Sequence, residues 1–206
     1  MRPFLTPATI GEPFRSVRDF PGVNLKSPLD DARADALLAV RCQLGERSAF
    51  DDLIARWHEP LWRYLCRLSN NDDIARDLTQ DTWLRVFRGI ARLREPSKLR
   101  PWLFGIARNV AMDRLRSQYG AATCADVNPE ELPAVDDVNL EEEFATLESG
   151  LANLPIVERE TLTLFYLREL SLEEIAGLVG VPVGTVKSRL FRARRMLRRE
   201  MGGEGS

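Results

Sequence analysis

The chain has 206 residues, a length that suits one or two small domains. Its 44% hydrophobic and 29% charged residues are typical of a globular protein and exclude a disordered or fibrous chain. No apolar run approaches the ~18 residues that a membrane-spanning helix needs. The amino-terminal residues 1–26 lack the order of a secretory signal. We therefore expect a cytoplasmic protein without direct membrane contact.

Cysteine and histidine are sparse. Cys42, Cys66 and Cys124 are widely spaced and form no Cys-x-x-Cys pair, and the only histidine is His58. Because free cysteine is among the residue types most often buried, we expect two thiols packed between helices and one in a linker. A zinc site or a catalytic thiol is the less favoured alternative, and we predict no metal and no cofactor.

Charge is unevenly distributed, although its net value is only −2. Between Tyr119 and Gly150 there are many carboxylates and no lysine or arginine, whereas the segment from Lys187 to Arg199 is strongly basic. Such asymmetry indicates nucleic-acid contact better than the total charge does.

The first half of the chain predicts helices after a proline-rich start. Residues 1–34 have no sustained period, which predicts a disordered extension. Apolar residues from Phe50 to Leu65 recur at three- and four-residue steps and predict one long helix or a pair kinked at Pro60. A second helix is expected from Asp72. Its predicted buried residues are Ile74, Leu78, Val86, Phe87 and Ile90.

A third helix is expected after Pro101, because proline suits a first helical turn, and a loop at 94–98 precedes it. Its predicted inner residues are Leu103, Ile106, Val110 and Leu115. The stretch 120–139 has the composition of a linker. Helical pattern returns near Leu140 and continues to Leu154, and the helices predicted after it span 156–167, 171–179 and 183–200.

No segment alternates with period two, so the predicted fold is all-α, with two small helical domains joined by a flexible acidic linker. The predicted boundaries are 35–118 for the first domain, 119–142 for the linker and 143–206 for the second domain.

The segment from Leu170 to Leu190 predicts a helix-turn-helix. Ser171, followed three residues later by Glu174, is typical of a capping box. Gly180 stands where a short turn needs a residue that tolerates positive φ. Pro182 and Gly184 then begin the next helix.

That next helix has two contrasting sides. Its apolar stripe consists of Val186, Leu190, Ala193 and Leu197. The residues expected to contact DNA from the other side are Thr185, Lys187, Ser188, Arg189, Arg192 and Arg195. Short polar residues at a helix start, with arginines along it, suit a helix that lies in the major groove. A solvated basic surface is the alternative interpretation.

Three motifs in order resemble conserved regions of the sigma-70 superfamily. Residues 72–87 (DDIARDLTQDTWLRVF) are similar to its second region, which docks on the clamp helices of the polymerase largest subunit. Residues 100–116 (RPWLFGIARNVAMDRLR) resemble the helix over the −10 element. Leu154-Pro-x-x-x-Arg-Glu and the later GTVKSRL at 184–190 resemble the fourth region, which reads the −35 element.

The likeness covers about residues 37–118 and 145–200. With only an acidic linker between the two regions, it points to the extracytoplasmic-function (ECF) branch, whose members are promoter-specificity factors and not enzymes. The proline-rich extension and the tryptophan at position 83 depart from the common pattern.

The resemblance implies roles for individual residues. Core-polymerase contacts are expected for Asp77, Leu78, Gln80, Asp81, Trp83 and Phe87. Contacts to the −10 element are expected for Lys98, Arg100, Arg108, Asn109, Asp113 and Arg116. The basic loop from Arg94 to Arg100 is where the family captures an extruded base. Considered without the family, the acidic surface would be a solvated helix face, and Trp102 is expected in the core rather than stacked on a base.

The implied partners are core RNA polymerase, through its clamp helices and flap, promoter DNA, and an anti-sigma factor. The free chain is expected to be a monomer. Two other classes stay open on the residues alone: a conventional helix-turn-helix regulator that acts without the polymerase, and a helical enzyme. For the enzyme, no nucleophile–base pair or phosphate-binding glycine loop is evident.

Overall fold

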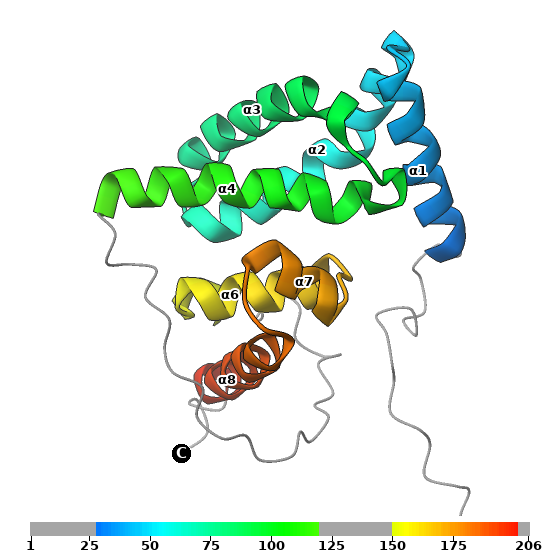
Figure 1. Ribbon diagram of the computed structural model, residues 1–206. Coiled ribbons are helices and arrows are strands. Elements are labelled where there is room, and N and C mark those ends of the chain that lie inside the picture. Colours follow the sequence, from blue (N-terminus) through cyan, green and yellow to red (C-terminus); the bar gives the residue numbers. More distant parts are fainter. Residues whose placement is uncertain (1–27, 120–149, 202–206) are drawn as a thin grey trace, which may run out of the picture.

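The structure is a computed structural model that describes residues 28–119 and 150–201. Every regular element in these residues is helical, which confirms the all-α fold (Figure 1). None of the described helices is both long and apolar enough to span a membrane. The acidic stretch 120–149 and residues 1–27, which hold most of the predicted linker and extension, lie outside the described residues, as does Cys124.

Four helices form the first domain: α1 (Pro28–Gln43), α2 (Arg47–Ser69), α3 (Asp72–Gly89) and α4 (Leu99–Tyr119). Two short 3-10 helices, η2 (Ile90–Arg92) and η3 (Pro96–Lys98), connect α3 to α4. The sequence predicted a disordered extension up to residue 34, but α1 already begins at Pro28, with Asp30 and Asp31 in its first turn. Acidic side chains there complement the positive end of the helix dipole, a signal available in the sequence.

The helix α2 is continuous, and Pro60 lies inside it. Of the two sequence predictions, one long helix is therefore the right one. It ends at Asn70, which has a φ of 51°, and Asn71 then caps α3 by accepting a hydrogen bond from the backbone N–H of Ile74. These two asparagines suit the turn because asparagine tolerates a left-handed backbone and caps helices well.

The buried side of α3 differs in part from the prediction. Leu78, Val86 and the following Ile90 are buried as expected, but Phe87 is 40% exposed. Two threonines, Thr79 and Thr82, are buried instead, and each hydroxyl donates to the carbonyl four residues earlier at 2.7 Å. Because that bond satisfies the hydroxyl within the helix, threonine can occupy an apolar interface.

The second domain contains α6 (Ile156–Leu162), a π-helical turn η5 (Thr163–Leu167), α7 (Leu172–Val179) and α8 (Val183–Met201). The three helices predicted at 156–167, 171–179 and 183–200 are thus confirmed, the first as α6 continued by η5. Helical residues 150–153 precede them and contribute Leu151 to a small core with Leu162, Ala193 and Leu197.

The two domains pack directly on each other. In Figure 1, α6 and α7 lie between the first domain and α8. The main hydrophobic core is continuous across the boundary and joins Phe104 and Leu103 of α4 to Leu164, Leu170 and Ile175. Trp102 is partly buried against this core, as predicted, and its ring lies 3.2 Å from the place a Cβ at Gly89 would take.

The two described cysteines are free thiols that pack between helices, as expected. Cys42 on α1 is buried and Cys66 on α2 is half-buried. Burial raises the pKa of both thiols, that of Cys66 to about 11. Within residues 28–119 and 150–201, no three His, Cys, Asp or Glu side chains gather into a group that would hold a metal ion.

Candidate polymerase and nucleic-acid interfaces

The outward face of α3 is acidic with an apolar part. Asp77, Gln80 and Asp81 are exposed on it, as predicted. Leu84 and Phe87 further along are 45% and 40% exposed. Leu84 was missed by the sequence interpretation, although its three- and four-residue steps from Asp81 and Gln80 place it on the same face. This surface is suited to basic partner groups around an apolar contact.

Two predicted polymerase contacts belong to the core instead. Leu78 is 5% exposed and Trp83 is 7% exposed. Trp83 stacks on Phe87 with ring centroids 5.8 Å apart, and its indole Nε1 donates a hydrogen bond to Nδ1 of His58. Both side chains lie on the buried side of α3. Trp83 therefore has almost no surface open to a partner, and Leu78 can be reached only at the floor of a pocket.

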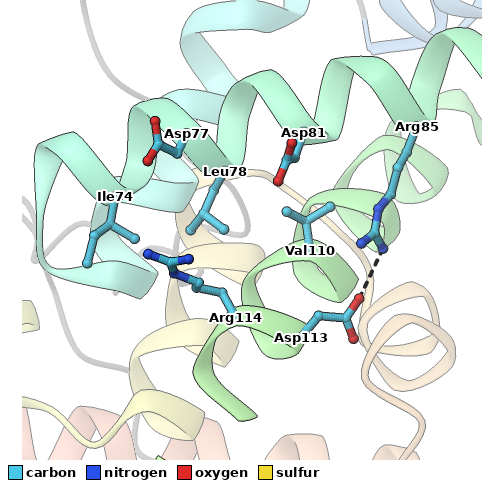
Figure 2. Close-up of a pocket in the computed structure, with 8 residues that line it drawn as sticks. All are labelled: Ile74, Asp77, Leu78, Asp81, Arg85, Val110, Asp113 and Arg114. Carbon is cyan, nitrogen blue, oxygen red and sulfur yellow. Dashed lines mark hydrogen bonds and ion pairs between the residues drawn. The ribbon is translucent and has the colours of Figure 1, made fainter. Parts of the chain in front are cut away.

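That pocket lies between α3 and α4 beside the acidic face (Figure 2). It is lined by Ile74, Asp77, Leu78, Asp81, Arg85, Val110, Asp113 and Arg114. Arg85 Nη1 lies 3.1 Å from Oδ2 of Asp113, while Asp77 and Asp81 stand at the α3 edge without that pairing. Three carboxylates against two guanidinium groups leave the rim acidic above an apolar floor.

Of the predicted −10 residues on the carboxyl half of α4, Asp113 lines this pocket. Asn109 is exposed. Asp113 pairs with Arg85 of α3 and, at 3.0 Å, with Arg116. Asp113 therefore faces the acidic surface of α3, and it lines the same pocket as Asp81. These contacts place Asp113 beside the candidate polymerase surface, whereas the sequence interpretation assigned it to DNA.

Arg100, at the start of α4, is held against the first domain. Its guanidinium lies 5.4 Å from the centre of the Trp57 ring and 4.0 Å from the carboxylate of Asp35. Asp35 is almost fully buried and also accepts from Arg56 Nε at 2.6 Å. Burial raises the pKa of Asp35, and the two arginines oppose that effect.

A buried polar contact joins the two domains at Glu160 of α6. Its Oε1 accepts hydrogen bonds from Tyr64 Oη of α2 at 3.0 Å and from Arg108 Nε of α4 at 2.9 Å. The Glu160 and Arg108 side chains are 2% and 19% exposed, respectively. Burial raises the pKa of both Glu160 and Tyr64, and the Arg108 charge acts against that rise.

Two further contacts join the first domain to the second. Lys98 Nζ lies 3.7 Å from Oε1 of Glu174 at the start of α7. The Arg168 guanidinium lies 5.8 Å from the centre of the Phe104 ring. Two of the predicted −10 cations, Lys98 and Arg108, are thus paired with carboxylates of the second domain, an arrangement that no local sequence pattern signals.

The helix-turn-helix has the predicted local geometry. Ser171 accepts from the backbone N–H of Glu174 at 3.1 Å, and the Glu174 carboxylate accepts from the backbone N–H of Ser171 at 3.0 Å, which completes the capping box. Gly180 ends α7 with a φ of 78°, a backbone that glycine adopts without strain.

The helix α8 buries its predicted stripe, and Lys187 and Arg195 are exposed. Thr185 is half-buried, and Arg192 pairs with Glu158 of α6 at 3.1 Å. Ser188 and Arg189 were expected on the open side, but each is only 5% exposed. The Ser188 hydroxyl donates to the Thr185 carbonyl, and the charge of Arg189 opposes the rise that burial causes in the pKa of Glu160. The buried face of α8 is therefore wider than its apolar stripe.

Known protein families match both halves of the chain. The sigma-70 region 2 family matches residues 53–120 and the sigma-70 region 4 family matches residues 145–197. The ECF RNA polymerase sigma factor SigM of Mycobacterium tuberculosis is 33% identical over 82% of this chain and 86% of its own length. This chain belongs to the ECF RNA polymerase sigma factors. It is therefore a transcription initiation factor, which binds core RNA polymerase and promoter DNA, and not an enzyme.

Other relatives agree with this placement of the sigma factor. The ECF RNA polymerase sigma-E factor of Haemophilus influenzae is 33% identical over 79% of this chain and 93% of its own length. SigE of Mycolicibacterium smegmatis is 31% identical over 83% of this chain and 68% of its own length.

Two solved structures share the fold of the sigma factor. The sigma factor RpoE of Bartonella quintana, solved with the anti-sigma factor NepR, has a TM-score of 0.57 and 24% identity, covering 76% of this chain and 98% of its own. CnrH, solved with the cytosolic domain of CnrY, has a TM-score of 0.61 and 23% identity, covering 84% of this chain and 99% of its own.

Proposed function

We propose that the sigma factor divides its work among three surfaces. The acidic face of α3 binds core polymerase, the η3 loop and α4 hold the −10 strand, and α8 reads the −35 element. We place this action in the bacterial cytoplasm, where the polymerase transcribes, with the free chain a monomer. The observation that carries the proposal is the exposure of Asp77, Gln80 and Asp81 on one side of α3.

The α3 surface combines charge with a small apolar contact. Asp77 and Asp81 stand at the edge of the pocket, while Leu84 and Phe87 continue the face as exposed apolar groups. An interface with a desolvated apolar centre and charged surroundings gains specificity from the charges and affinity from the centre. We propose that a basic side chain of the polymerase enters the pocket between α3 and α4, where Asp113 adds a third carboxylate.

Abortive transcription with purified core polymerase tests this surface. Asp81→Arg should abolish promoter-specific initiation because it places a cation against the basic partner surface. Asp51→Arg makes the same charge change at an exposed position of α2 and should initiate like the wild type. If Asp81→Arg initiates normally, this docking surface is wrong. If the wild-type protein alone shifts duplex DNA and gives core polymerase no promoter specificity, the result favours a conventional helix-turn-helix regulator that acts without the polymerase.

For the −35 element, the exposed cations of α8 are the best supported contacts. Lys187 and Arg195 are open to solvent, and Thr185 at the helix start is half-buried. Arg192, Arg189 and Ser188 need a rearrangement before they reach DNA, because the first is paired and the others are buried. We therefore expect Lys187→Ala and Arg195→Ala to weaken promoter binding by the holoenzyme and to reduce its salt dependence.

An anti-sigma factor is a further proposed partner. RpoE of Bartonella quintana was solved bound to one, and it has the fold of this sigma factor. The contact between the two domains combines a buried ion pair with apolar packing. A helical segment of an anti-sigma factor would compete for these same groups.

A further inference from the structure

The outer side of α1 carries an apolar stripe. Among the residues that the structure describes, five large apolar side chains are exposed, and three of them stand on α1 or directly after it. Leu37, Val40 and Leu44 are 62%, 38% and 80% exposed. The backbone N–H of Leu44 donates to the Val40 carbonyl at 3.0 Å, so Leu44 continues the helical turn. Steps of three and four residues place the three side chains on one side of the helix, away from the buried Leu38 and Cys42. A contiguous group of this kind marks a surface for a partner.

The polar groups beside the stripe are satisfied within the first domain. Arg41 forms ion pairs with Glu46 and with Asp52 of α2. The Gln43 side chain donates to the backbone carbonyls of Ile90 at 3.1 Å and Leu93 at 2.7 Å. Because these neighbouring groups already have partners, the stripe is suited to an apolar segment rather than to a charged one.

The stripe is also short, which limits what it fits. Leu37 and Leu44 are seven residues apart, which is about 10 Å along a helix axis. A stable interface buries about 800 Å² on each partner, and three partly exposed side chains supply only a fraction of that area. The stripe is therefore too small to hold a second copy of the chain. An extended segment, at about 3.3 Å per residue, covers it with three or four residues.

The amino-terminal segment 1–27 leads directly into α1 and contains side chains of the required kind. Its large apolar residues are Phe4, Leu5, Ile10, Phe14, Val17, Phe20, Val23 and Leu25. Along α1, Leu37 is about 14 Å and Leu44 about 24 Å from Pro28. Eight extended residues span about 26 Å, so Phe20 can reach the level of Leu44, and Phe14 has chain to spare. The length of the segment therefore allows both phenyl rings to contact the stripe.

We infer that the segment 1–27 binds the apolar stripe of its own α1 through Phe14 and Phe20. Covalent attachment makes this binding intramolecular, with an effective concentration of about 1 mM. A contact with a dissociation constant of only about 0.1 mM then holds about nine in ten molecules in the bound form. Two rings on two leucines are a contact of that modest strength. The inference does not depend on the polymerase and DNA surfaces proposed above.

NMR of the full-length free chain, labelled at the leucine methyl groups, tests the inference directly. An aromatic ring shifts the resonances of the methyl groups that it contacts. The double substitution Phe14→Ser/Phe20→Ser should therefore move the methyl resonances of Leu37 and Leu44. Leu84, an exposed leucine of α3, is the internal control and should not change. Phe4→Ser makes the same replacement elsewhere in the segment and should leave all three leucines as in the wild type.

Limited proteolysis approaches the same contact from α1. Trypsin cleaves after Arg15 and Arg18, which lie between the two phenylalanines. Cleavage follows the population of the unbound form, so Leu37→Gln/Leu44→Gln should accelerate it by about tenfold over the wild type. Ala32→Gln introduces the same side chain at an exposed position of α1 outside the stripe and should leave the rate unchanged. Circular dichroism confirms that each variant keeps its helices.

The inference is overturned if the Leu37 and Leu44 resonances are the same with and without Phe14 and Phe20. It is also overturned if those resonances change only when core polymerase is added, because the stripe would then belong to the polymerase surface. Resonances that depend on protein concentration would show contact with a second copy and would likewise exclude the intramolecular contact. A tryptic cleavage rate that the stripe substitutions leave unchanged counts against it in the same way.

Discussion

The indole nitrogen of Trp83 donates a hydrogen bond to Nδ1 of His58, 3.3 Å away, and so ties α3 to α2. Because Trp83 also stacks on Phe87, it supports from below the face of the helix that we assign to the polymerase. The only histidine of the chain thus serves the packing of the first domain.

Substitutions at Trp83 and at the nearby Gln80 should therefore have separate effects, the first on stability and the second on polymerase binding. Trp83→Ala removes a buried aromatic side chain and should lower the free energy of unfolding by about 3–5 kcal/mol. Gln80→Ala, one turn away and exposed, should change stability by no more than about 0.5 kcal/mol while weakening polymerase binding. Urea unfolding and a polymerase-binding assay check both variants. A Trp83→Ala protein of wild-type stability would show that this tryptophan is not core.

The capping box at the start of α7 makes a second prediction. Ser171→Ala leaves the Glu174 backbone N–H without its acceptor and should cost about 0.5–2 kcal/mol. Ser97→Ala, at an exposed position of η3, is the matched control and should be close to neutral. Thermal unfolding measures both, and equal midpoints for the two variants would contradict the cap.

The junction of α1 and α2 is predicted to be sensitive to acid. Hydrogen bonds from Arg41 and then Ser48 lower the pKa of Glu46 from 4.5 to about 2. A lowered pKa means that the stabilisation is present above pH 4.5 and is lost as the pH falls from 4.5 towards 2. The unfolding midpoint of Glu46→Gln should therefore fall less steeply over that interval than that of the wild type.

An exposed carboxylate elsewhere provides the comparison for Glu46. Glu95→Gln should keep the acid sensitivity of the wild type, because the Arg41–Glu46 pair is intact. Carbon-detected NMR titration reads the Glu46 carboxylate directly. A titration midpoint near 4.5 in the folded protein would contradict the pairing.

Alkylation should reveal the environment of Cys66. Burial, and after it the Asp72 carboxylate, raises the pKa of this thiol from 9.0 to about 11. Only the thiolate reacts, so at pH 8 iodoacetamide should label Cys66 about a hundredfold more slowly than a thiol with the ordinary value. Asp72→Asn should speed the reaction, and peptide mass spectrometry locates the label. Labelling of Cys66 at the ordinary rate would refute the raised pKa.

Local patterns in the sequence predicted most of the helices and the second-domain turn. The capping box at Ser171 and the glycine at 180 are governed by residues a few positions apart, so composition and spacing suffice to place them. Periodicity was less reliable for α3, where the buried Thr79 and Thr82 look polar in the sequence and the exposed Leu84 looks apolar. The polarity of these side chains is opposite to what their buried or exposed positions would suggest, so their burial follows only from the packing of the folded helix.

The candidate site could be predicted only in part from the sequence, because the pairing and burial of several of its residues depend on the contact between the two domains. Asp77, Gln80 and Asp81 lie exposed on one helix face, and their spacing alone places them together. The pairing of Arg108 with Glu160 joins residues 52 positions apart and has no counterpart in any local pattern. The burial of Arg189 likewise depends on how α8 lies against α6, which a motif does not encode.

The order of the helices along the chain also sets when the contact between the two domains can form during synthesis. Tyr64 and Arg108 are translated before Glu160, and the four helices that carry them can pack on one another as they leave the ribosome. Synthesis of the remaining chain takes on the order of seconds. Every newly made molecule therefore passes through an interval in which Tyr64 and Arg108 have not yet met Glu160, and this contact between the two domains cannot form while the second domain is still being translated.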